Sequence, residues 1–159
     1  ESVFAKSTTA LVDIEAEDTA VVVLKFRNGA LGVIEASTAT RPKDLEGSIS
    51  VLGEKGSVEI GGFAVNEMKV WQFSDELPSD EDVISKYSVN PPDVYGFGHM
   101  AYYEHVVDCI DNRKQQLVDG FQGRRSLELI SAIYESIETG QEVRLQFVPT
   151  HSKLGRVEL

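Results

Sequence analysis

The sequence is poor in the features that place a protein in a membrane or in an oxidising compartment. Its only cysteine is Cys109, and no run of apolar residues approaches the roughly 20 residues of a membrane span. A lone thiol cannot form a bridge within the chain, and no N-terminal signal peptide is visible. We therefore expect a cytoplasmic protein that contacts no membrane, with Cys109 as a small, partly buried residue of a helix.

Basic residues are also scarce. The 159 residues include 15 Lys and Arg against 26 Asp and Glu, which gives a formal net charge of -11. This balance provides no basic surface for a phosphate backbone and excludes nucleic acid as a partner. The length suits a single domain, which buries roughly 70% of its unfolded surface and needs no disulfide or metal in order to fold.

Complete catalytic motifs are missing. The chain contains no GxSxG, HExxH or GxxxxGK[ST] pattern, and Gly96-Phe97-Gly98 matches only the first half of the dinucleotide motif GxGxxG and follows a loop instead of a strand. His99 and His105 are spaced so that a helix places them on opposite faces, which does not suit a metal. We therefore expect no metal site and no catalytic residue within this chain.

What the chain does contain is a run of strand-like segments, then two helical ones and a last strand. Asn28-Gly29 predicts a tight turn between two strands, and Gly140 predicts the end of the second helix. This order favours an α+β domain whose large, mainly antiparallel sheet carries helices on one face. The predicted strands are 1–12, 19–26, 30–38, 47–52, 57–60, 67–73 and 142–147, and the predicted helices are 96–112 and 123–139, followed by a polar tail at 151–159.

One face of such a sheet has no helix to cover it. Val21, Val23 and Val33 alternate along two strands so that they share this face, and they are too apolar to be left in water. We therefore expect the open face to mediate homo-oligomerisation or docking to another domain.

The first helix carries the strongest candidates for ligand contact. His99 and Tyr103 lie one turn apart near its start, so an imidazole and a phenol could together hold a polar substrate such as a sugar. Arg41 and Lys43, in a loop that follows a strand, could contact an anionic group such as a diphosphate. The alternatives are that His99 and Tyr103 are buried and bonded to the backbone, and that Arg41 and Lys43 are solvated surface charges.

A long acidic segment, 74–95, precedes this helix. It contains several Asp and Glu residues and the pair Pro91-Pro92, and it has no helical or strand period. Loops of this length are uncommon inside compact domains unless they serve a function, so we expect a lid or an arm that contacts a partner.

Taken in order, these segments resemble the C-terminal domain of the glucose–fructose oxidoreductase, inositol dehydrogenase and MocA-like (Gfo/Idh/MocA) family of NAD(P)-dependent oxidoreductases. No one segment is distinctive alone, but their order along nearly the whole chain is. The matching segments are Glu17 to Ala20, Phe26 to Ala30, Val51 to Glu59, Gly98 to Tyr103 and Ile133 to Val143.

The resemblance implies that this chain is one domain, 1–159, of a larger dehydrogenase. In that family an N-terminal Rossmann domain, absent from this chain, binds NAD or NADP and supplies a catalytic lysine, and an Asp and His pair precedes the first strand. The domain that resembles this chain binds substrate and mediates oligomerisation. The resemblance therefore implies hydride transfer to or from a hydroxyl of a sugar, nucleotide-linked sugar or cyclitol, and an isolated chain that binds no cofactor and is inactive.

The resemblance also bears on the candidate residues. Tyr103 falls where some relatives place a substrate-contacting tyrosine, and the pattern from Gly98 to Tyr103 looks most like members that act on nucleotide-linked sugars, such as the 3-dehydrogenases of UDP-N-acetylglucosamine uronic acid. This implies that His99 and Tyr103 contact the sugar and that Arg41 and Lys43 contact its diphosphate. The alternative, from a different class, is a stand-alone, non-catalytic α+β binding or assembly module, because the residues themselves contain no complete active site.

Overall fold

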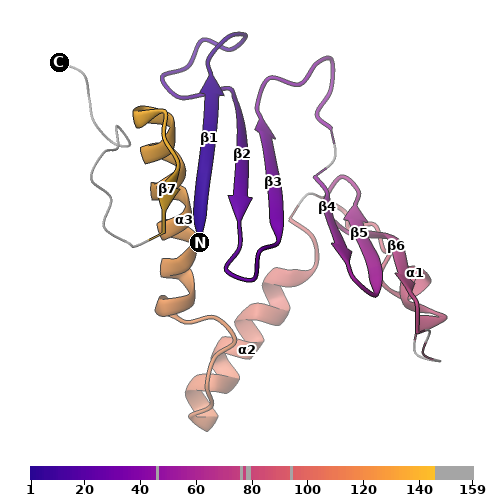
Figure 1. The fold of residues 1–159 in the computed structure, drawn as a ribbon. Helices are drawn as coiled ribbons and strands as arrows, with labels where there is room; N and C mark the ends of the chain where they lie inside the picture. The colour runs from indigo at the N-terminus through magenta and orange to yellow at the C-terminus, as the bar shows by residue number, and fades with distance from the viewer. Residues whose placement is uncertain (46, 76, 78–79, 94, 146–159) are drawn as a thin grey trace. The chain divides into compact units, whose positions relative to one another are not determined.

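The structure is a computed structural model that describes residues 1–45, 47–75, 77, 80–93 and 95–145. These residues form two compact units (Figure 1). The first contains residues 1–41 and 117–145, and the second contains residues 42–116. The predicted tail at 151–159 and the end of the predicted strand 142–147 lie outside the described residues.

The first unit is built on a four-stranded antiparallel sheet. Its order is β3-β2-β1-β7, with β1 at Ser2–Thr8, β2 at Thr19–Lys25, β3 at Leu31–Ser37 and β7 at Val143–Arg144. The predicted turn between β2 and β3 is confirmed, since Gly29 has a φ of 90° and the Phe26 N–H donates to the Ala30 carbonyl at 2.9 Å. Glycine suits this turn because it has no Cβ to oppose a positive φ.

One long helix, α3 (Gly120–Thr139), covers one face of this sheet and lies beside β1 and β7 (Figure 1). It begins earlier than the predicted Gly123 because the Asp119 carboxylate accepts a hydrogen bond from the Gln122 N–H at 2.8 Å and caps the first turn. It ends as predicted at Gly140, whose φ is 67°. The core between helix and sheet consists of Val3, Ala5, Val22 and Ala132, with Leu24, Ile34, Leu129, Ile133, Ile137, Val143 and Leu145 packed against them.

Ser136 of α3 completes the hydrogen bonding of β1. Its hydroxyl accepts from the Ala5 N–H at 2.9 Å and donates to the Gln141 carbonyl at 2.6 Å, and the side chain is fully buried. Strand β7 pairs only with Ser2 and Val3, so the hydroxyl takes the place of the next partner along the strand.

Replacing Ser136 with alanine is therefore expected to destabilise the chain by about 1–3 kcal/mol, because a buried N–H and a carbonyl both lose their partner. Urea denaturation measures the loss. Ser126→Ala is the matched control, since Ser126 is an exposed residue of the same helix. Equal losses in the two variants would contradict the assigned role of Ser136.

The second unit contains a three-stranded antiparallel sheet in the order β4-β5-β6. Strand β4 is Ile49–Gly53, β5 is Gly56–Gly61 and β6 is Glu67–Phe73. Gly53 pairs with Gly56, so the predicted strands 47–52 and 57–60 are joined as a hairpin. A short helix, α1 (Val83–Lys86), lies against β6, and a longer one, α2 (Gly98–Asn112), follows.

The α+β class with antiparallel pairing is confirmed, but the strands form two sheets instead of one large sheet. Strand β3 lies at the edge of the first sheet and β4 at the edge of the second. The connection between them contains Pro42, which has no N–H and restricts the residue before it. A proline does not extend a strand ladder, because it has no N–H group to donate to the next strand.

The acidic segment after β6 is bound along that strand by side chains. The Trp71 indole donates to Asp80 at 2.9 Å, the Ser88 hydroxyl accepts from the Met68 N–H at 3.1 Å, and the Asn66 amide donates to the Val89 carbonyl at 3.0 Å. The Trp71 indole N–H also holds the pKa of Asp80 below its ordinary value. Over its described residues up to Asn90, this segment is therefore anchored along β6, and its role as a lid or as an arm that contacts a partner stays a prediction.

The loop between β1 and β2 is anchored to both layers of the first unit. The Asp18 carboxylate accepts from the N–H groups of Ala10, Leu11 and Val12 at 2.8, 2.6 and 3.0 Å. On the helix side, the Tyr134 hydroxyl donates to Glu17 at 2.8 Å, and this bond raises the pKa of Tyr134. Two acidic residues of this loop, Glu17 and Asp18, therefore stabilise its conformation.

Candidate functional site

The candidate site is built on the start of α2. Asp93 makes the turn that leads into the helix, because its carboxylate accepts from the Tyr95 N–H at 2.9 Å and its carbonyl accepts from the Gly96 N–H at 3.3 Å. Gly96 has a φ of 68°, a left-handed conformation that costs glycine little. The turn places the ring of Tyr95 against that of His99, with ring centroids 6.1 Å apart in an edge-to-face arrangement.

His99 and Tyr103 are both exposed on α2, and Tyr103 is 64% exposed. They are one helical turn apart, so they share a face. The alternative that both belong to a core, bonded to the backbone, does not describe this structure. An exposed imidazole next to an exposed phenol can donate and accept hydrogen bonds to the hydroxyl groups of a ligand.

Tyr95 belongs to this cluster but is not a candidate from the sequence. The sequence alone places it in the acidic segment, although it stands as far before His99 as Tyr103 stands after it. That spacing was the available signal, but only the turn at Gly96 brings the two rings together. Tyr95 is 72% exposed and therefore also accessible to a ligand.

The exposed face of α2 continues beyond Tyr103. Met100, Val107 and Ile110 share its face at helical spacing and are 68%, 56% and 71% exposed. Val106 and Cys109 of the same helix are more buried than these three residues. Most of the apolar surface on the face of α2 that carries Tyr103 remains accessible in the structure.

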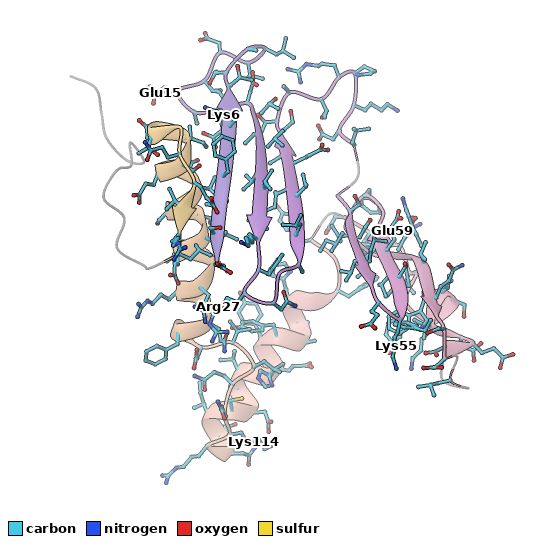
Figure 2. The ribbon with its side chains drawn as sticks, viewed as in Figure 1. Lys6, Glu15, Arg27, Lys55, Glu59 and Lys114 are labelled. Atoms are coloured by element: carbon cyan, nitrogen blue, oxygen red, sulfur yellow. The ribbon has the colours of Figure 1, made fainter. Side chains whose placement is uncertain are left out.

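Cys109 is a buried residue of α2, as expected. Its sulfur lies 3.4 Å from Nε2 of His105 and donates to the Gln115 carbonyl at 3.7 Å. At the end of the helix, Lys114 forms an ion pair with Asp108 at 2.9 Å, which lowers the pKa of Asp108 and raises that of Lys114 (Figure 2). Among the described residues, no group of three or more His, Cys, Asp and Glu side chains could hold a metal ion.

Arg41 and Lys43 are both exposed in the connection after β3. Arg41 belongs to the first unit and Lys43 to the second. One guanidinium nitrogen of Arg41 donates to the Thr40 carbonyl at 2.8 Å, which leaves its other N–H groups for an anion. The structure thus brings together Tyr95, His99 and Tyr103, and it describes Arg41 and Lys43 separately from them.

Gly96 and Gly98 do not belong to the phosphate-binding turn of a Rossmann unit. Gly96 and Gly98 open α2, but the last strand before them, β6, ends at Phe73, and the phosphate-binding turn of a Rossmann unit joins a strand directly to a helix. We derive no step through a nicotinamide from the residues of this chain. In the described part of the chain, no helix has the length and apolarity to cross a membrane.

Comparison with known proteins finds similarity to parts of several dehydrogenases. The scyllo-inositol 2-dehydrogenase (NAD(+)) of Bacillus subtilis is 28% identical over 131 residues, which cover 80% of this chain and 35% of the relative. The structure of the WlbA dehydrogenase from Bordetella pertussis, in complex with NADH and UDP-GlcNAcA, has a TM-score of 0.83 and 43% identity, and covers 90% of this chain and 41% of that one. The structure of WlbA from Chromobacterium violaceum, in complex with the same two ligands, has a TM-score of 0.82 and 44% identity. It covers 92% of this chain and 40% of that one.

This chain therefore spans about two fifths of the length of the solved WlbA proteins and about a third of the inositol dehydrogenase. The model of the oxidoreductase family's C-terminal alpha/beta domain matches residues 1–145, which include every described residue. The chain belongs to the Gfo/Idh/MocA oxidoreductase family and corresponds to its C-terminal alpha/beta domain.

Proposed function

We propose that this chain is the substrate-binding and oligomerisation domain of a larger NAD(P)-dependent dehydrogenase that oxidises a hydroxyl of a nucleotide-linked sugar to a carbonyl, or reduces that carbonyl to the hydroxyl. The observation that carries the proposal is the identity of 43–44% to two WlbA dehydrogenases in complex with UDP-GlcNAcA. The identity to the inositol dehydrogenase is only 28%, so a charged nucleotide sugar is favoured over a cyclitol.

The exposed cluster on α2 supports this assignment. The hydroxyl of Tyr103 and the ring nitrogens of His99 offer donors and acceptors on one face, which is the combination that a sugar ring with several hydroxyl groups requires. Tyr95, packed edge to face on His99, restricts the orientation of the imidazole. We assign sugar contacts to His99 and Tyr103.

Arg41 and Lys43 are assigned to the diphosphate of the substrate. Both side chains are exposed, and a guanidinium matches the geometry of phosphate oxygens. The net charge of -11 makes local cations necessary for the negatively charged diphosphate, because the chain as a whole repels it. The nicotinamide and the group that exchanges the substrate proton belong, in this proposal, to an N-terminal Rossmann domain.

The proposed activity is tested on the full-length protein. The reading frame upstream of Glu1 is expected to encode a Rossmann domain, and the purified protein is expected to reduce NAD or NADP with UDP-GlcNAcA and not with scyllo-inositol. A stop codon directly upstream would favour the stand-alone module instead. Turnover of scyllo-inositol alone would overturn the nucleotide-sugar assignment while retaining the dehydrogenase.

Tyr103→Phe in the full-length protein is expected to lower kcat/KM for the sugar substrate about fivefold, since one hydrogen bond contributes about 1 kcal/mol. Cofactor affinity should not change. Tyr102→Phe is the matched control, because Tyr102 is also exposed but points about 100° away around the helix. If both variants keep the parent's kinetics, Tyr103 is not a substrate contact.

The oligomerisation role is assigned to the open face of the four-stranded sheet. Val21, Val23 and Val33 lie on the face opposite α3 and are 45%, 45% and 65% exposed. Burial of such residues stabilises an interface by about 25 cal/mol per Å² of apolar surface, before the cost of association is subtracted. Light scattering at tens of micromolar is expected to show an oligomer, and a monomer would contradict the assignment.

A further inference from the structure

We propose that the exposed ring of Tyr95 is a platform on which the apolar face of the substrate's pyranose ring stacks, and that Gly98 keeps the neighbouring surface clear for it. This inference rests on the proposed function and deepens it, because it adds the contact that selects the hexose of the nucleotide sugar. It follows from the way the Tyr95 ring is held, from the groups beside it and from a glycine that the fold does not require.

The ring of Tyr95 is held in place and is still open to a ligand. The Asp93 carboxylate accepts a hydrogen bond from the Tyr95 N–H at 2.9 Å, and the Tyr95 ring meets that of His99 edge to face at an interplanar angle of 75°. A ring held in this way loses little conformational freedom when a ligand binds, which preserves affinity. The same side chain is 72% exposed, so the described residues leave most of its surface uncovered.

The groups beside Tyr95 suit a sugar ring better than a purely apolar ligand. The C–H bonds on one face of a pyranose carry a small positive charge, which matches the negative face of an aromatic ring. The hydroxyl groups of the same pyranose need donors and acceptors nearby. The His99 ring lies 6.1 Å from the Tyr95 ring between centroids, and Tyr103 follows about 6 Å further along the helix axis, so stacking and hydrogen-bonding groups are close neighbours.

The hexose, and not the base, is assigned to this platform. In a nucleotide sugar the diphosphate separates the base from the hexose, so the two rings lie at opposite ends of the molecule. Tyr95 packs on His99, which the proposed function assigns to the sugar. The ring that lies over Tyr95 is therefore the hexose, and stacking of the base on Tyr95 is the alternative that the experiment must exclude.

Gly98 is a second, independent indication that a ligand approaches this turn. It is the first residue of α2, it has no positive φ, and a Cβ at this position would meet no atom of the described residues within 4 Å. Neither the backbone conformation nor the packing of the described residues requires glycine there, although glycine stabilises a helix less than alanine does. A residue without a side chain allows a ligand to approach closely, and Gly98 directly precedes His99. A sugar ring that lies over the start of the helix accounts for this glycine.

Calorimetric titration of the full-length protein with UDP-GlcNAcA, and separately with UDP, tests the platform while the reduced nicotinamide cofactor prevents turnover. Tyr95→Leu is expected to weaken binding of UDP-GlcNAcA about fivefold, because the aromatic face is lost, and to leave binding of UDP unchanged. Tyr95→Phe keeps the ring and should restore the affinity for UDP-GlcNAcA. Gly98→Ala should also weaken binding of UDP-GlcNAcA but unfold at the same urea concentration as the parent. Tyr102→Leu is the matched control, because Tyr102 is an exposed tyrosine of the same helix, and it should change neither affinity.

The results separate the platform from the proposed function. If the parent does not bind UDP-GlcNAcA, the proposed function fails and the platform fails with it. If the parent binds UDP-GlcNAcA but Tyr95→Leu or Gly98→Ala binds it equally tightly, the function stands and the platform is wrong. Equal losses of affinity for UDP-GlcNAcA and for UDP would show that Tyr95 meets the nucleotide, which also overturns the proposal.

A double-mutant cycle distinguishes direct contact with the sugar from positioning of His99. If the Tyr95 ring touches the sugar, Tyr95→Leu should weaken binding of UDP-GlcNAcA in a His99→Ala background as well. If Tyr95 only orients the imidazole, its substitution should have no further effect in that background, and Tyr95 is then not a platform. Circular dichroism confirms that each variant is folded.

Discussion

Asp18→Asn is expected to lower the thermal unfolding midpoint by several degrees at neutral pH. Among the described residues, Asp18 is the one charged side chain that is buried, at 1% exposed. Its Oδ2 accepts three backbone N–H bonds from residues 10–12, and these bonds shape the loop between β1 and β2. An amide removes the negative charge that strengthens these bonds, and it brings a donor into a site made of donors.

The pH dependence of this effect has a defined sign. Chiefly through the Leu11 N–H, the loop lowers the pKa of Asp18 below its ordinary value. The stabilisation by the carboxylate is therefore fully present above the unfolded pKa, about 3.9, and is lost as the pH falls through the lowered pKa of the folded state. The stability difference between parent and Asp18→Asn should shrink in the same range.

Urea denaturation of both chains, at pH values from about 7 down to about 3, measures this difference. Asp13→Asn is the matched control, because Asp13 is an exposed residue of the same loop. A difference that persists unchanged to the lowest pH would show that the charge of Asp18 does not stabilise the loop.

Gly56→Ala is expected to disrupt the second unit, at a cost of about 3 kcal/mol or more. A Cβ on Gly56 would lie 2.4 Å from the Gln72 carbonyl oxygen and 2.4 Å from a ring carbon of Phe73. The oxygen belongs to the backbone of β6, which pairs with β5 from Gly56 onward, so it cannot move without breaking the ladder. The expected result is a loss of the sheet's order at the end of the hairpin.

Fluorescence of Trp71 reports this change, because Trp71 lies in β6 and its indole is bonded to Asp80. Gly98→Ala serves as the control in the same unit, since a Cβ there meets no atom within 4 Å. If Gly56→Ala unfolds at the same urea concentration as the parent, the close approach of β5 and β6 is not required for the fold.

The two proposed surfaces serve different parts of the function. The face of α2 that carries His99 and Tyr103 offers polar tips on an exposed helix, which suits a small ligand with many hydroxyl groups. The open face of the sheet offers exposed β-branched side chains, which suit a second sheet of the same kind. Substitutions on one surface should therefore leave the activity assigned to the other unchanged, apart from effects of oligomeric state on stability.

The sequence by itself determined what depends on neighbouring residues. The strand from Glu67 to Phe73, the turn at Gly29 and the helix end at Gly140 are all where it predicts them, because alternation and glycine act within a few residues. The ordered family segments likewise identified the domain, as the match over residues 1–145 confirms.

Only the tertiary structure decided what depends on packing across the chain. Ser136 replaces a strand partner, Asp18 is buried under its own loop, and Tyr95 meets His99 through a turn that neither residue encodes. The division of the strands into two sheets and the exposure of Tyr103 also depend on packing across the chain. Burial and pairing are set by whatever segment lies opposite, and the side chains of one strand or helix do not specify that segment.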